Sequence, residues 1–181
     1  MTRLFVALSI PVSLSDQIAA IQKHITESSA QMTCVSPSLM HITLTFIGEV
    51  EERDVDLISS ALSTVSSKRF SLSADAIKFN NYKQPRVLWL RMHTNPILLE
   101  LVQKVEQVLI PFGVKKESRQ YHPHITIARI KRTSPDLVPL VDSYRDSISC
   151  TFDVSSFVLK KSVLTPNGPI YSDISEVRLH A

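Results

Sequence analysis

The stretches HITLTFIG at residues 41–48 and HPHITIARI at residues 122–130 contain the same pattern, a histidine followed two positions later by a threonine. In both stretches aliphatic residues alternate with polar ones, which predicts a strand with one buried and one polar face. Side chains two positions apart share a face of a strand. We therefore predict that each strand presents one imidazole and one hydroxyl side by side.

The segments around these strands repeat in a similar order. Apolar residues recur at helical spacing from about 13 to 25, from 51 to 66 and from 96 to 112, and the last of these helices ends at Gly113. Segments with strand propensity are residues 4–8, 70–79, 86–92, 151–164 and 170–179. Pro166, Asn167, Gly168 and Pro169 predict a turn between the last two strands. We predict an α+β fold with two similar lobes.

Length and composition favour one domain over residues 1–181. The chain has 181 residues, 44% of them hydrophobic and 20% charged, with a net charge of +3. It has only three glycines, and none lies in a dinucleotide-binding or P-loop pattern. Two cysteines argue against a disulfide scaffold, and no apolar stretch approaches the roughly 20 residues that cross a bilayer. We expect a cytoplasmic monomer that does not associate with membranes.

The repeated pattern carries a specific chemistry if the two strands meet around a groove. Imidazole titrates near neutral pH, so a neutral His124 or His41 can take a proton from water while its protonated partner gives one to a leaving oxygen. The hydroxyls of Thr43 and Thr126 can donate to phosphate oxygens. Such a site can displace a group at phosphorus without a metal ion or other cofactor.

A metal site is the alternative for the second motif. His122 and His124 share a strand face, but the nearest acidic residues, Glu117 before them and Asp136 after them, are not close enough in sequence to complete a familiar ligand set. A supporting or flanking role for His122 is therefore the preferred interpretation, and we predict no metal.

Five segments together resemble one known family. With the opening RLFVALSIP (3–11), the central RVLWL (86–90) and the closing SVLTPNGPIY (162–171), the two motifs resemble the two-histidine (2H) phosphoesterase superfamily. The resemblance is to the RNA 2′,3′-cyclic phosphodiesterases, first described as 2′-5′ RNA ligases. It implies a bilobed α+β fold of mainly antiparallel sheet, with helices on the outer faces and a central groove lined by the two strands. It also implies metal-independent hydrolysis of RNA 2′,3′-cyclic phosphate ends to 2′-phosphomonoesters.

The resemblance also implies roles for individual residues. His41 matches the general acid that protonates the leaving 3′ oxygen, and His124 matches the base that activates water. Thr43 and Thr126 match phosphate-binding threonines, and Arg129 matches an arginine that faces the phosphate. Arg129 lies five residues beyond His124, on the opposite face of a regular strand, so it needs a bulge, a twist or the strand end to reach the groove.

The aromatic residues near the motifs have two interpretations. Phe46, Tyr121 and Tyr171 can stack on a nucleobase, but aromatic strand residues are more often part of the core or its rim. Phe46 has the same parity as Ile42 and Leu44, which predicts a core position. Trp89 is assigned to packing. Basic residues flank the second motif and form either a rim that attracts RNA or simply a solvated surface. They are Lys115, Lys116, Arg119, Lys131 and Arg132.

Three alternatives remain open at the level of sequence. The same site can act on another small cyclic nucleotide or a 2′-5′ oligonucleotide, or it can run in reverse as a weak 2′-5′ RNA ligase. A noncatalytic RNA-binding module that keeps the groove is a further possibility, although both histidines and both threonines are present.

Overall fold

The computed structural model describes residues 1–116, 118–166 and 168–181. Its strands are β1 (Thr2–Ser9), β2 (Gln31–Cys34), β3 (His41–Val50), β4 (Phe70–Phe79), β5 (Val87–Met92), β6 (His124–Arg132), β7 (Thr151–Val154), β8 (Ser156–Thr165) and β9 (Gly168–Arg178). Its α-helices are α1 (Val12–Ile25), α2 (Val55–Ser63), α3 (Pro96–Leu109) and α4 (Leu137–Ser143). Short 3₁₀ helices span Pro37–Leu39, Glu52–Asp54 and Ile110–Phe112.

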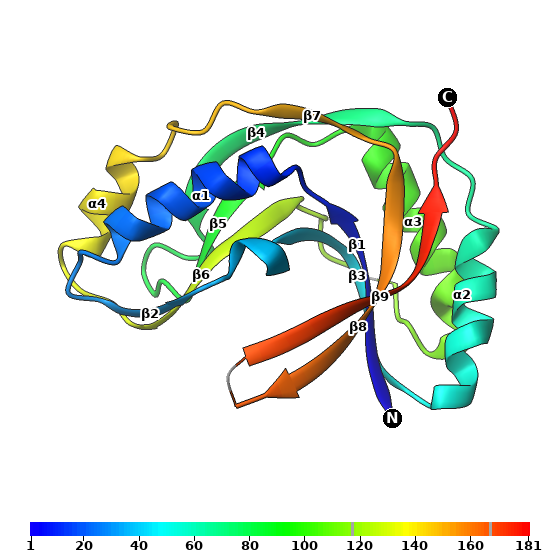
Figure 1. Cartoon of the computed structure of the whole chain (residues 1–181). Coiled ribbons are helices and arrows are strands. Elements are labelled where there is room, and N and C mark those ends of the chain that lie inside the picture. The colour runs from blue at the N-terminus through cyan, green and yellow to red at the C-terminus, as the bar shows by residue number, and fades with distance from the viewer. Residues whose placement is uncertain (117, 167) are drawn as a thin grey trace.

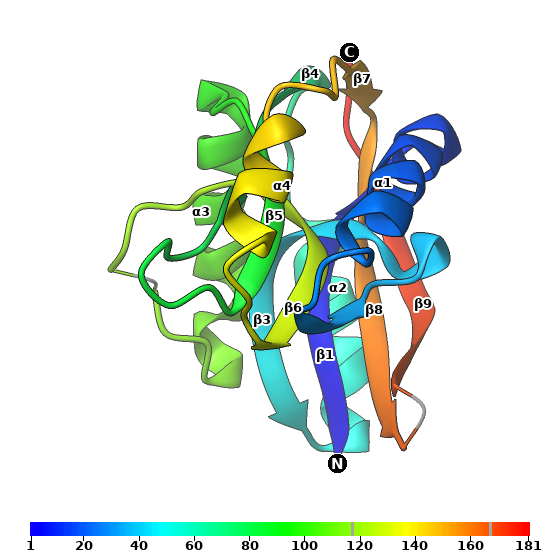
Figure 2. The same cartoon turned by 90° about the vertical axis from the view of Figure 1, so that its left-hand side faces the viewer.

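The strands form one curled sheet whose two halves meet at the histidine strands (Figures 1 and 2). The order is β7-β4-β5-β6-β3-β1-β8-β9, every neighbouring pair is antiparallel, and β2 pairs with β6 beside this path. The register between β3 and β6 consists of one pair, Ile42 with Ile125. The predicted two-lobed α+β architecture is confirmed, and the two lobes join where the motifs lie.

The helices cover the sheet in two pairs. Helices α1 and α4 lie together over the lobe that contains β4, β5 and β6, and α2 and α3 lie together on the other side of the molecule (Figures 1 and 2). Helix α3 begins at Pro96, after Asn95, whose side-chain oxygen accepts a hydrogen bond from the backbone N–H of Ile97 at 2.8 Å. The predicted helical periodicity is confirmed for α1, where Leu14, Ile18, Ile21 and Ile25 are buried.

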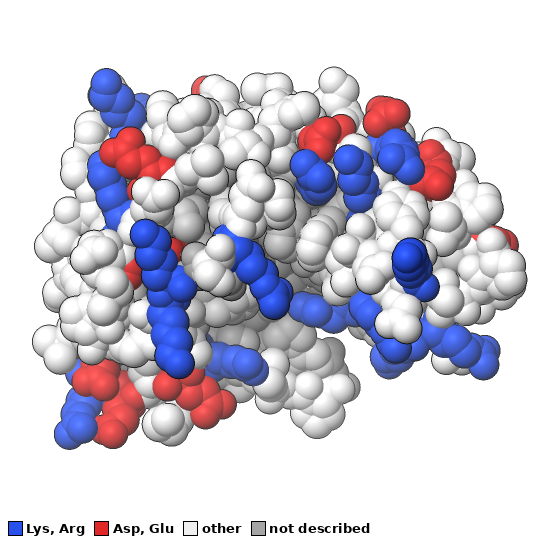
Figure 3. Space-filling view, turned by 180° about the vertical axis from the view of Figure 1, so that it is seen from behind, with Lys and Arg blue, Asp and Glu red and all other residues white. Residues whose placement is uncertain are grey.

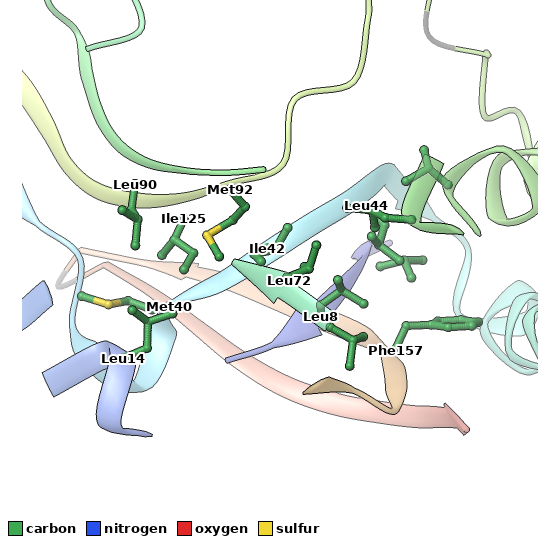
Figure 4. Packing of buried hydrophobic residues seen from close by; sticks show 14 of the residues in the cluster. Leu8, Leu14, Met40, Ile42, Leu44, Leu72, Leu90, Met92, Ile125 and Phe157 are labelled. Carbon is green, nitrogen blue, oxygen red and sulfur yellow. The ribbon is translucent and has the colours of Figure 1, made fainter. Parts of the chain in front are cut away.

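A single apolar core runs under both histidine motifs. Ile42 and Leu44 of β3 and Ile125 and Ile127 of β6 are 0–3% exposed, as the alternating pattern predicts. Figure 4 shows Ile42 and Ile125 among residues of both lobes. Because tightly packed side chains hold the two strands from behind, their polar faces are displayed on a rigid base.

Two elements were not predicted. Strand β2 has only four residues, QMTC, too few to show a clear alternation in the sequence. Helix α4 has seven residues and contains Pro139, and a segment this short shows little periodicity. The expected helix at 51–66 is shorter in the structure, with α2 ending at Ser63.

The predicted turn near the C-terminus is described only in part. Gly168 has φ +114°, a conformation that glycine adopts readily, while Asn167 lies outside the described residues. Among the helices that the structure describes, none has both the length and the apolar character needed to cross a membrane.

Candidate active site

The register of β3 against β6 brings the two motifs face to face. Ile42 pairs with Ile125 in antiparallel fashion, so His41 and Thr43 flank this central pair on β3, and Thr126 and His124 flank it on β6. The two apolar side chains of the central pair point into the core, so the four polar ones share the other face. The structure therefore brings together all four motif residues that the sequence identified.

The ring of His41 is oriented by two hydrogen bonds. Its Nδ1 lies 2.8 Å from the carbonyl oxygen of Leu39, and its Nε2 lies 3.1 Å from Oγ1 of Thr43. A carbonyl oxygen only accepts hydrogen bonds, so Nδ1 carries a proton and donates it. Nε2 is therefore the nitrogen that faces the threonine and is left for chemistry.

The ring of His124 is held in the same way. Its Nδ1 donates to the carbonyl oxygen of His122 at 2.8 Å, again two residues upstream. The indole of Trp89, on β5, stacks on this imidazole with 4.3 Å between ring centroids and 29° between planes. The sequence assigned Trp89 to packing; in the structure this side chain is half-buried and stacks on the imidazole of His124, a contact that the sequence did not show.

Burial lowers the pKa of both histidines from the ordinary value of 6.5. For His41, the hydrogen bond to Leu39 opposes this effect, and the positive charges of Lys160 and of protonated His124 lower the pKa further. For His124, the bond to the His122 carbonyl opposes the effect of burial and the charge of the His122 ring adds to it. The rings of His41 and His124 thus lie within electrostatic reach of each other.

Each motif strand contains a bulge three residues after its histidine. In the β5–β6 ladder Trp89 pairs with Thr126 and Leu88 with Ala128, so Ile127 has no partner on β5. An extra residue of this kind reverses the face on which later side chains point. Arg129 is consequently on the same face as Thr126, as we predicted it must be to reach the groove.

The charge of Arg129 also acts on the opposite lobe. Burial raises the pKa of the Tyr171 hydroxyl on β9, and the positive charges of Arg129 and Arg3 oppose that rise. The guanidinium on β6 is therefore near enough to influence a side chain of the opposite lobe.

The prediction that Phe46 belongs to the core is wrong. In the β1–β3 ladder Thr43 pairs with Ala7 and Thr45 with Val6, so Leu44 is the bulged residue. The bulge reverses the parity, and Phe46 lies on the face of His41 and is 71% exposed. Phe46 and Arg129 are thus equivalent positions, each five residues after a motif histidine.

The wall beside His41 is aromatic and charged. Tyr171 meets the His41 ring edge-on, with centroids 5.5 Å apart, and Phe5 lies 4.9 Å from the same ring. Lys160 forms an ion pair with Asp173 on the neighbouring strand. A cavity of about 400 Å³ lies beside this wall and is lined by Ser38, Leu39, Met40, His41, Lys160, Tyr171 and Asp173.

Tyr121 has a structural contact to the first motif. Its hydroxyl donates a hydrogen bond of 2.8 Å to the backbone carbonyl of Thr43, and burial raises the pKa of that hydroxyl. The phenol is therefore engaged beneath the site, which argues against the base-stacking role that the sequence left open for it.

The residues around the groove differ in charge from a typical metal site. Within the described residues, no group of three or more His, Cys, Asp and Glu side chains is placed to hold a metal ion. Lysine and arginine side chains border the central hollow in the space-filling view of Figure 3. The arrangement of two imidazoles, two hydroxyls and a guanidinium fits an anionic group such as a phosphate.

Comparison with known proteins agrees with this chemistry. A family model described as LigT like phosphoesterase matches residues 8–89 and 93–171, which is most of the chain. The chain belongs to the LigT like phosphoesterase family. An RNA 2′,3′-cyclic phosphodiesterase of Archaeoglobus fulgidus is 34% identical over 95% of this chain and 97% of its own length. Another of that name, from Methanocaldococcus jannaschii, is 33% identical over 96% and 99%.

Solved structures share the fold. The crystal structure of Escherichia coli LigT complexed with 3′-AMP superposes with a TM-score of 0.81, at 24% identity and 98% coverage of both chains. A Thermus thermophilus protein, TT0787, gives 0.80 at 22% identity and 97% coverage of both chains. The bilobed architecture expected from the sequence is therefore that of known phosphoesterases.

Proposed function

We propose that this protein hydrolyses the 2′,3′-cyclic phosphate end of RNA to a 2′-phosphomonoester, using His41 as general acid and His124 as general base. The observation that carries the proposal is the matched pair of histidines on adjacent strands, each with Nδ1 held by a backbone carbonyl. This leaves Nε2 of each ring for proton transfer, and Nε2 of His41 also lies 3.1 Å from the Thr43 hydroxyl. The near full-length relatives named RNA 2′,3′-cyclic phosphodiesterase support the substrate class.

The attack begins with His124 in its neutral form. Because its Nδ1–H donates to the His122 carbonyl, the lone pair on Nε2 is the basic site. Nε2 takes a proton from a water molecule as the water oxygen bonds to phosphorus. The indole of Trp89 stacks on the imidazole of His124, so the ring keeps one orientation during the proton transfer.

The leaving group departs with help from His41 in its protonated form. As the bond between phosphorus and the 3′ oxygen breaks, the Nε2–H of His41 donates its proton to that oxygen, which leaves as a 3′ hydroxyl. The product keeps the phosphate on the 2′ oxygen. His124 then returns its proton to solvent and His41 takes one up, which restores the starting state.

The remaining residues hold the phosphate. The hydroxyls of Thr43 and Thr126 donate hydrogen bonds to nonbridging phosphate oxygens. The guanidinium of Arg129 donates charged hydrogen bonds that stabilise the negative charge developing on the phosphate in the transition state. Through these donors the protein itself supplies the charge stabilisation, and we propose that turnover needs no metal ion. Phe46, exposed on the same face, offers a flat surface for the terminal base.

The wider setting of this activity is also a proposal. We take residues 1–181 to be one two-lobed domain that works as a cytoplasmic monomer, because a single chain supplies both motifs and both walls of the site. The Lys and Arg side chains beside the hollow in Figure 3 would attract the RNA backbone. Reverse 2′-5′ ligation follows from microscopic reversibility but is disfavoured in water.

The test uses a short RNA ending in a 2′,3′-cyclic phosphate, incubated with the purified protein in EDTA. Mass spectrometry and a 2′-specific enzymatic digest identify where the product carries its phosphate. A 2′-phosphate supports the proposal. A 3′-phosphate, or turnover only after metal is restored, contradicts it, and binding without turnover would indicate an RNA-binding module. Parallel reactions with a free cyclic nucleotide and a 2′-5′ oligonucleotide separate the alternative substrates.

A further inference from the structure

One buried polar side chain outside the groove connects the two halves of the site. Gln22 lies on α1, is 8% exposed, and donates two hydrogen bonds from Nε2, to the carbonyl of Val35 at 2.8 Å and to the carbonyl of Ile127 at 2.9 Å. The two hydrogens of an amide nitrogen satisfy both acceptors at once. Removing a buried amide nitrogen that satisfies two carbonyls is costly, because both acceptors lose their donor.

One of the two acceptors, the carbonyl of Ile127, belongs to the bulged residue of the second motif strand. Ile127 lies between Thr126 and Arg129, and it has no partner on β5. Its carbonyl accepts the backbone N–H of Val35 at 2.9 Å in addition to the amide of Gln22. These two donors fix the peptide whose extra residue reverses the parity and directs Arg129 to the groove face.

The other acceptor, the carbonyl of Val35, lies at the start of the segment that leads to the first motif. Val35 directly follows β2, and the 3₁₀ helix Pro37–Leu39 follows it. The carbonyl of Leu39 at the end of that helix holds Nδ1 of His41. Strand β6 changes its partner at this point, from β3 at Ile125 to β2 at Ala128 and beyond.

From these contacts we infer that Gln22 is a positioning residue for the reaction, because it fixes the β6 bulge that aims Arg129 at the phosphate and ties it to the segment that orients His41. The inference rests on the proposed function. Gln22 touches no reacting atom and acts only through Ile127 and Val35. Small displacements of a positioned group far from the chemistry can reduce rates by about a hundredfold, so the effect is measurable.

The test is a double-mutant cycle. Gln22→Met keeps the length and volume of the side chain but removes both donors. We expect it to lower kcat/KM by about tenfold to a hundredfold in the wild-type background. In the Arg129→Ala background we expect a smaller loss, because one of the two groups that Gln22 positions is already missing. The part of the loss that acts through His41 remains. A shift in the pH profile should accompany the loss, since the segment that holds His41 also moves.

Two control variants on the same helix separate positioning from general destabilisation. Gln17→Met makes the same chemical change at an exposed site on α1, and Ile18→Val trims a fully buried side chain there. Both should leave kcat/KM within about twofold. Equal losses for Gln22→Met in the two backgrounds, or a loss matched by Ile18→Val at equal melting temperature, would overturn the inference. If Gln22→Met does not fold, Gln22→Asn, which draws the amide back by one methylene, enters the same cycle with the same expectations.

A measurement without substrate keeps the inference separate from the proposed function. Hydrogen exchange of the Val35 amide, whose N–H shares the Ile127 carbonyl with Gln22, should accelerate at least tenfold in Gln22→Met, while amides of β8 keep their rates. Unchanged exchange at Val35 overturns the inference whatever the substrate is. If the wild-type protein shows no turnover of cyclic phosphate RNA while Val35 behaves as expected, the proposed function fails, and the link that Gln22 makes between Val35 and Ile127 stands.

Discussion

Replacing Arg129 by alanine tests whether the bulge in β6 has a functional consequence. The register places its guanidinium on the face of Thr126, and its charge is felt at Tyr171 on the opposite lobe. A hydrogen bond to a charged group contributes about 1.5–3 kcal/mol. Because each 1.36 kcal/mol corresponds to about a factor of ten in rate, Arg129→Ala should lower kcat/KM by roughly ten- to 150-fold. Arg129→Lys should fall between, since an ammonium keeps the charge but loses the two-pronged geometry.

The assay for this prediction is kcat/KM on a dinucleotide 2′,3′-cyclic phosphate at constant ionic strength. Arg53→Ala is the control, because it removes the same charge from a side chain that is 79% exposed, on the 3₁₀ helix Glu52–Asp54 and outside the site described above. The control should stay within about twofold of wild type, as surface substitutions usually do. A loss of less than threefold for Arg129→Ala, or an equal loss in the control, would refute the reasoning from the bulge.

Three further predictions follow from the site. Burial holds the pKa of both His41 and His124 below 6.5, and turnover needs one ring protonated and the other neutral. The pH profile of kcat/KM should therefore peak below pH 6.5 and fall toward pH 8. A maximum above pH 7 would contradict this prediction. Lys160→Met removes a charge that lowers the pKa of His41, so an NMR titration should show that pKa rising, and an unchanged value would refute the assignment. Tyr121→Phe leaves the Thr43 carbonyl without that donor and should lower the free energy of unfolding by about 1–3 kcal/mol in urea; no change would show the bond to be unimportant.

The alternating patterns were sufficient to predict both motif strands and the pairing of each histidine with its threonine. They also predicted that Ile42 and Ile125 are buried. These features depend only on the two-residue period of a strand and on burial of one face, which are local properties of the sequence. The full-length resemblance added the joining of the two lobes at a central groove.

The bulges mark the limit of such reasoning. Nothing in TLTF signals an extra residue, since it contains no glycine and continues the alternation. In TIAR the two consecutive apolar residues Ile127 and Ala128 interrupt the alternation, and both are buried. Strict alternation therefore put Phe46 in the core, where the structure shows it exposed. The same error was avoided for Arg129 only because this residue matches an arginine that faces the phosphate in the family. That match required the side chain to lie on the groove face of the strand.

Contacts between distant segments were likewise not predictable from one sequence. Trp89 contacts His124 because β5 pairs with β6. Tyr171 contacts His41 although two strands, β1 and β8, lie between β3 and β9 in the sheet. Gln22 reads as one more polar position on an amphipathic helix until the carbonyls that it binds are known. Sheet order and register determine these contacts, and a local pattern contains neither.

The measurement that tests the account most directly compares three histidine variants on RNA with a 2′,3′-cyclic phosphate end, in EDTA. General acid–base catalysis contributes about a hundred- to ten-thousandfold per group, so His41→Ala and His124→Ala should each lose turnover on that scale while still binding RNA. His93→Ala, at an exposed histidine just after β5, should keep wild-type activity and yield the 2′-phosphate. Retention of wild-type turnover by either motif variant would contradict the two-histidine mechanism.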